Sequence, residues 1–179
     1  MPKKTLRGKQ RILKGRPAFS RGDQLLRKHL LALLDSNEAH LAFADAIQGF
    51  VPGVRGVRPP GAAHTAWQLL EHLRICQWDI LEFSRNPQHV SPVFPDGYWP
   101  ESAAPRDDKA WRRSVVAFRS DLRAMAKLIA DPKRELLARV PHPKAKAMHT
   151  LLREALLLAD HNAYHIGQLI LLRRLLGTM

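Results

Sequence analysis

The stretch that decides the fold is residues 151–176, which read LLREALLLADHNAYHIGQLILLRRLL. Its apolar residues recur every three or four positions, the period of one face of an α-helix. His161 and His165 lie four residues apart within it, so their imidazoles stack along one side of that helix. Burying imidazoles costs free energy unless something binds their nitrogens. The stretch therefore predicts a long helix whose histidines meet either a metal ion or a carboxylate.

Three further segments have helical periodicity, and no segment shows the period-2 alternation of a β-strand. Pro52-Gly53 and Asp131-Pro132 mark helix ends, because proline cannot continue a helix. The residues at 35–37, Asp-Ser-Asn, favour helix poorly, so the first helix is expected to kink or break there. We predict helices at about residues 20–52, 64–84, 107–131 and 148–176.

Residues 85–106 carry five prolines, which exclude a regular helix. A helix of about 20 residues is roughly 30 Å long, and an extended segment of this length spans more than that. The segment can therefore run the full length of a bundle, held to it by Phe94, Tyr98 and Trp99 near the mouth of a pocket. We predict an all-α, four-helix bundle in up-down-down-up order, with this long crossover between helices 2 and 3.

The positive charge of the chain is concentrated at its N-terminus. The formal net charge is +13, and residues 1–28 account for +9 of it. We expect residues 1–22 to form a basic, disordered tail and residues 23–179 to form one folded domain. Such a tail could bind nucleic acid by neutralising phosphates, but this is the less favoured expectation, because Phe19 is the only aromatic residue that could stack on bases.

Cysteine usage and hydropathy indicate the compartment. Cys76 is the only cysteine, which excludes an intramolecular disulfide and fits a reducing environment. It lies on the apolar stripe of the second helix, where we expect an inert, buried thiol. No apolar run approaches the roughly 20 residues that span a bilayer, and the N-terminus lacks the apolar segment of a secretory signal. We expect a cytoplasmic protein with no membrane partner.

A third metal ligand has to come from another helix, and His72 is the best candidate, in the middle of the second helix at the edge of its apolar stripe. Three neutral histidines would leave one coordination position open, as in reactive metal sites. His64 is a competing ligand, and His40 is expected to be a core histidine. By spacing alone, ordinary core or surface histidines remain the more common explanation. The remaining histidines are expected to be solvated: His29, His89, His142 and His149.

Two motifs in this order carry a resemblance to a known family. Residues 65–74 read TAWQLLEHLR, and residues 160–168 read DHNAYHIGQ, about 90 positions later. Together they resemble the DinB/YfiT-like superfamily of metal-dependent enzymes, over roughly residues 24–177. The resemblance implies the same four-helix bundle and a divalent metal, usually zinc or nickel, bound by three histidines. Position by position, these ligands fall on His72, His161 and His165.

The resemblance also implies a chemistry. Better understood relatives are similar to thiol-dependent S-transferases and isomerases whose cosubstrate is a low-molecular-weight thiol such as bacillithiol or mycothiol. A metal lowers the pKa of a bound thiol, and it could activate water in the same way, which leaves a hydrolase as an alternative. A non-catalytic metal-binding or ligand-binding bundle is a third option, and no catalytic residue is identified. We expect a small-molecule substrate, with a homodimer as an open option. The side chains expected around the metal or its pocket are Glu71, Asp79, Glu154, Asp160, Gln168, Tyr98 and Trp99.

Overall fold

The computed structural model describes residues 20–35 and 38–178 of the chain. Residues 1–19, which make up most of the predicted basic tail, lie outside this described part. All regular elements among the described residues are helical, apart from one isolated bridge between Arg139 and Thr150. The prediction of an all-α protein is therefore confirmed. The elements are α1 (Arg21–Asp35), α2 (Phe43–Ala46), η1 (Pro52–Val54), α3 (Ala66–Arg85), η2 (Asp96–Tyr98), α4 (Asp108–Ala130) and α5 (Leu151–Leu175).

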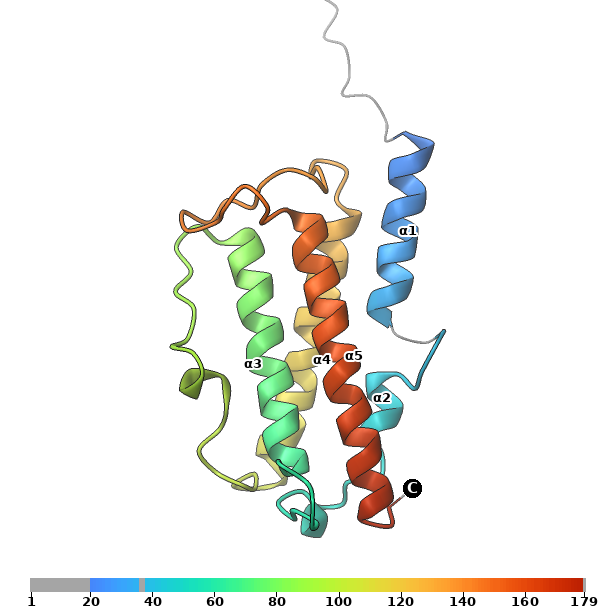
Figure 1. The fold of residues 1–179 in the computed structure, drawn as a ribbon, viewed down its shortest axis with the longest axis vertical. Coiled ribbons are helices and arrows are strands. Elements are labelled where there is room, and N and C mark those ends of the chain that lie inside the picture. The colour runs from blue at the N-terminus through green and yellow to red at the C-terminus, as the bar shows by residue number, and fades with distance from the viewer. Residues whose placement is uncertain (1–19, 36–37, 179) are drawn as a thin grey trace, which may run out of the picture.

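The long helices lie side by side. α3 and α4 run in the same direction, and α1 and α5 run in the opposite one (Figure 1). α3 packs against both α4 and α5, while α1 contacts α4 and α5. Residues 86–107 leave the end of α3 and return along its outer side to the start of α4 (Figure 1). This return path places η2 against α3.

The first predicted helix is in fact two helices. α1 ends at Asp35, and the four-residue α2 follows at Phe43–Ala46. Asp35 begins the sequence Asp-Ser-Asn, whose short polar side chains compete with helical hydrogen bonds; residues 36–37 lie outside the described part of the chain. The prediction that His40 is a core histidine is wrong. It lies after the break, is exposed, and has its Nδ1 3.0 Å from the carbonyl oxygen of Leu41.

Side-chain caps determine where the long helices begin. Thr65 and Gln68 form a capping box at the start of α3, in which each side chain bonds the backbone N–H of the other residue. The hydroxyl of Thr65 also donates to the carbonyl of Ala103, 2.6 Å away. Asp107 caps α4 and Thr150 caps α5. The box therefore ties the beginning of α3 to the returning segment.

The core consists of two apolar clusters stacked along the helices. One cluster surrounds Leu70, Phe118 and Ile166, and the other surrounds Leu81 and Leu158. A buried polar pair lies between them along α3 and α5: the amide of Asn162 donates to Gln77 Oε1 at 2.9 Å, and Gln77 donates to the carbonyl of Phe118. His72, His161 and His165 lie on the same two helices as this pair. No helix of the described residues has both the length and the apolar character needed to cross a bilayer.

Candidate metal centre

Three imidazoles from α3 and α5 converge on one another. The Nε2 atom of His72 lies 3.1 Å from Nε2 of His165 and 3.1 Å from Nε2 of His161. His72 and His165 are 8% and 7% exposed, so both rings are removed from solvent. The i, i+4 spacing on α5 places His161 and His165 one turn apart, and the packing of α3 on α5 brings His72 to both.

The hydrogen-bond acceptors at Nδ1 of His72 and His165 determine which ring nitrogen carries the proton. Nδ1 of His72 lies 2.9 Å from the backbone carbonyl oxygen of Tyr98, and Nδ1 of His165 lies 2.9 Å from Oε1 of Gln168. Both oxygens can only accept, so each Nδ1 carries the proton and donates. In a neutral ring the Nε2 atom is then unprotonated. Two nitrogen lone pairs thus face each other at 3.1 Å with no hydrogen between them, an arrangement that a cation would relieve.

The environment keeps these rings neutral. Burial lowers the pKa of His72 to about 4, although its hydrogen bond to Tyr98 acts in the opposite direction. Burial and the neighbouring imidazoles lower the pKa of His161 to about 4, and burial lowers the pKa of His165 as well. Neutral imidazoles are the form that binds metal ions, and nitrogen donors suit zinc, nickel and copper. The donor set therefore fits a divalent transition metal.

An aromatic stack covers His72 from the crossover side. The Trp99 ring lies on the His72 ring with centroids 3.8 Å apart and an angle of 4° between the planes. The His64 ring also stacks on Trp99, with the two ring centroids 3.9 Å apart. His64, the competing ligand in the sequence, thus stands against Trp99. Tyr98 and Trp99 hold the crossover against α3, as expected, whereas Phe94 is 83% exposed and does not.

Asp79 acts on the centre through the crossover. Its two oxygens accept from the Tyr98 hydroxyl at 2.8 Å and from His89 Nε2 at 2.7 Å. Burial and the hydrogen bond to Asp79 raise the pKa of Tyr98, which stays protonated and donates. Because the carbonyl of Tyr98 accepts from His72, Asp79 holds the residue that orients a candidate ligand.

Two histidines that are predicted to be solvated are buried. His89 and His142 are 8% and 4% exposed, so the prediction that they are solvated is wrong. His89 lies in the turn after α3, where Asp79 bonds its ring. His142 donates from Nε2 to the carbonyl of His89 at 2.8 Å. A loop position suggests exposure, but these two loops pack on each other, and only the tertiary fold determines that contact.

The other acidic candidates are engaged elsewhere. Glu71 forms an ion pair with Arg74 at 2.8 Å, and Arg74 and Ser114 lower the pKa of Glu71 against the raising effect of burial. Glu154 is buried and forms an ion pair with its neighbour Arg153 at 2.9 Å. Asp160 is exposed on α5. Of the expected surrounding residues, Gln168, Tyr98 and Trp99 contact a candidate ligand directly, and Asp79 acts through Tyr98.

Cys76 lies closer to the centre than its predicted role as an inert core thiol implies. It is buried, as predicted, but its Sγ lies 3.6 Å from Nδ1 and 3.7 Å from Nε2 of His72. Ligand atoms of His72, Cys76 and His161 all lie within 4.8 Å of one another. Burial, followed by the charge of Asp79, raises the pKa of Cys76 to about 12, so the group is a thiol in the metal-free protein. In the sequence, the i, i+4 spacing of Cys76 from His72 on one helix already indicates that the two side chains are neighbours.

Comparison with known proteins identifies the family. The family model described as the DinB superfamily matches residues 40–169. This range includes α3, α4 and most of α5, together with all three converging histidines. No curated protein and no solved structure shows significant similarity to the chain. On the family match, which covers well over half of its length, the chain belongs to the DinB superfamily.

Proposed function

We propose that this protein is a metal-dependent enzyme in which His72, His161 and His165 hold one divalent ion, zinc or nickel. The observation that carries the proposal is the close approach of three imidazoles: Nε2 of His72 lies 3.1 Å from Nε2 of His165 and 3.1 Å from Nε2 of His161. Buried nitrogens with no shared proton are unfavourable in an empty site and favourable around a cation. We further propose that the parallel and antiparallel long helices form the up-down-down-up four-helix bundle expected from the family resemblance.

The proposed reaction is S-transfer to a small molecule, with a low-molecular-weight thiol as cosubstrate. An ion held by three histidines would lower the pKa of a thiol that reaches it. The chain contributes the rest: neutral imidazoles leave the charge of the site uncompensated, which favours an anionic sulfur. The Trp99 ring shields His72 from water, and the carbonyl of Tyr98 keeps its Nε2 directed toward the other two rings. Activation of water by the same group would instead give a hydrolase.

A non-catalytic metal-binding bundle is the second candidate function, and Cys76 is the observation that favours it. Its Sγ is 3.7 Å from Nε2 of His72, close to the separation of about 3.6 Å expected between nitrogen and sulfur ligands of one tetrahedral zinc ion from the usual bond lengths. Four protein ligands would close the coordination sphere, as in structural sites. Three would leave it open for a cosubstrate. The two functions therefore differ in whether Cys76 binds the metal.

Elemental analysis of protein purified without added metal tests the site. We expect up to one divalent ion per chain, and His72→Ala, His161→Ala and His165→Ala should each lose most of it. His40→Ala is the matched control, because His40 is exposed and should leave the metal content unchanged. A triple-alanine variant that retains the wild-type metal content would overturn the ligand assignment.

Cobalt substitution tests the reaction class. Cobalt bound by sulfur absorbs strongly in the near ultraviolet, so the spectrum reports whether a sulfur atom reaches the ion. We expect this absorption to appear only when bacillithiol, mycothiol, glutathione or cysteine is added, and to persist in Cys76→Ser. Absorption that is present without an added thiol and is lost in Cys76→Ser would favour the closed, non-catalytic site. No response to any of the four thiols would overturn the S-transferase proposal.

A further inference from the structure

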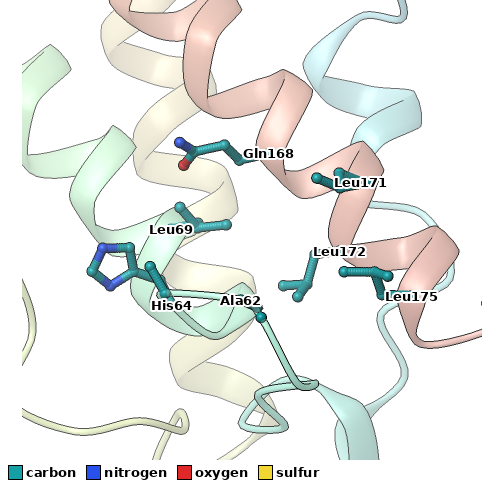
Figure 2. Close-up of a pocket in the computed structure, with 9 residues that line it drawn as sticks. Ala62, His64, Leu69, Gln168, Leu171, Leu172 and Leu175 are labelled. Carbon is teal, nitrogen blue, oxygen red and sulfur yellow. The ribbon is translucent and has the colours of Figure 1, made fainter.

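A pocket of about 240 Å³ opens beside the candidate metal centre, between the start of α3 and the C-terminal half of α5 (Figure 2). The loop before α3 forms its lower wall, where Gly61 turns the chain at a φ of 82°. A left-handed conformation of this kind favours glycine. The residues that line the pocket are Gly61, Ala62, Ala63, His64, Leu69, Gln168, Leu171, Leu172 and Leu175.

The pocket shares groups with the candidate centre. Leu69 lies one turn before His72 on α3, and Gln168 lies one turn after His165 on α5. Gln168 accepts the Nδ1 proton of His165 at 2.9 Å, so its amide stands between the pocket and a candidate ligand. The pocket is therefore about one helical turn, or roughly 5 Å, along the helix axes from the converging imidazoles.

The chemistry of the lining restricts the ligand. The walls are aliphatic or glycine apart from His64 and Gln168, and none of the lining residues carries a permanent charge. Because Gln168 uses its oxygen for His165, its amide NH₂ is left to donate, and its side chain points from α5 toward Leu69 (Figure 2). Burial and Arg58 lower the pKa of His64, which is therefore neutral at pH 7. Such a lining accepts an apolar body with one hydrogen-bond acceptor and disfavours a charged group.

The volume and the rim are consistent with a small ligand. A dry cavity of about 150 Å³ lined by aliphatic and aromatic side chains binds benzene, so this larger pocket admits a substituted ring or a short branched chain. Leu171 and Leu175 are 55% and 52% exposed at its edge. Contact with an apolar ligand would remove part of this surface from water.

We propose that this pocket binds an uncharged, mainly apolar small molecule that carries one carbonyl or hydroxyl acceptor, and that this molecule is the substrate. The assignment as substrate rests on the proposed function. The ligand's acceptor receives a hydrogen bond from the amide of Gln168, which directs that end of the molecule toward the imidazole cluster. The apolar body lies among Leu69, Leu171 and Leu172.

Acetophenone is a suitable probe, because it combines a ring with a carbonyl acceptor and has no charge, and benzoate is its charged counterpart of equal size. Titration of the full-length, isotope-labelled protein by NMR should shift the amides of residues 61–64 and the side-chain amide of Gln168. We expect millimolar affinity for acetophenone and at least tenfold weaker effects of benzoate on residues 61–64. Equal responses to the two probes, or none to acetophenone, would overturn the proposal.

Two matched variants locate the binding. Leu171→Trp places a larger side chain at the pocket, whereas Leu156→Trp changes another exposed leucine of α5 that does not line it. We expect at least a tenfold loss of acetophenone affinity in Leu171→Trp and an unchanged affinity in Leu156→Trp. Retained affinity in Leu171→Trp would overturn the proposal. Elemental analysis of the same samples separates the two proposals: binding in protein that never carries metal supports the pocket and overturns the metal-dependent function.

Discussion

Replacing Asp79 should weaken metal binding although Asp79 touches none of the three candidate ligands. Its carboxylate accepts from the Tyr98 hydroxyl at 2.8 Å and from His89 at 2.7 Å, and the carbonyl of Tyr98 accepts from His72. In Asp79→Ala both donors lose their acceptor. The Tyr98 carbonyl then no longer has a fixed position, and the His72 ring can rotate away from the cluster.

The magnitude follows from these contacts. A hydrogen bond to a charged group contributes about 1.5–3 kcal/mol to stability. Because Tyr98 is partly exposed and its bond is weakened by solvent, we expect the two hydrogen bonds to Asp79 together to contribute about 2–3 kcal/mol. For a chain of this size each kcal/mol shifts the melting temperature by about 2–4 °C. We therefore expect metal-free Asp79→Ala to melt roughly 4–12 °C lower. Loss of a partner that orients a metal-bound histidine typically reduces metal affinity by about 10–100-fold, and we expect a reduction in this range.

The assay is a competitive titration of zinc against a chromophoric chelator, together with thermal melts with and without metal. Asp160→Ala is the matched control, because Asp160 is an exposed carboxylate next to His161 in the sequence. We expect its zinc affinity to change less than about threefold. Wild-type affinity in Asp79→Ala, or an equal loss in Asp160→Ala, would refute the orienting role of the crossover.

Three further predictions test the same region. The pKa values of His72 and His161 are about 4 in the folded protein and about 6.5 in the unfolded chain, so the unfolded state binds more protons between these pH values. Urea denaturation of the metal-free protein should therefore show a free energy of unfolding that decreases as the pH falls from 6.5 toward 4. A free energy of unfolding that does not change over this range would contradict the prediction. Cys76→Ser should keep its zinc under the three-histidine assignment, and elemental analysis showing near-complete loss would make Cys76 a required ligand. Gln77→Leu leaves the Asn162 amide without its acceptor in the core and removes the side-chain donor to the Phe118 carbonyl, which keeps its bond within α4. The change should lower the free energy of unfolding by about 1–3 kcal/mol, whereas an unchanged urea midpoint would mean that the Asn162 amide finds another partner.

The sequence by itself predicts the helices, because helical periodicity and helix-ending residues are local properties. The helix start predicted near residue 64 and the helix end predicted at Asp131-Pro132 agree with α3 and α4 to within a few residues. The prolines between α3 and α4 exclude a helix there, and chain length alone allows the return along α3. The i, i+4 spacing places His161 and His165 on one side of α5 wherever that helix packs. The end of α1 at Asp35 has a weaker signal, since a few residues that favour helix poorly can also be tolerated inside a helix.

Only the tertiary structure decides what faces these residues. That His72 meets His165 at 3.1 Å depends on the register between α3 and α5, to which distant parts of the core contribute. The proton positions depend on Tyr98 and Gln168, and Tyr98 comes from a segment without periodicity. The burial of His89 beside Asp79 likewise depends on how a segment without periodicity packs against α3. Spacing along a helix determines the direction of a side chain, but the partner of that side chain is a non-local contact, and packing free energy summed over the whole core selects it.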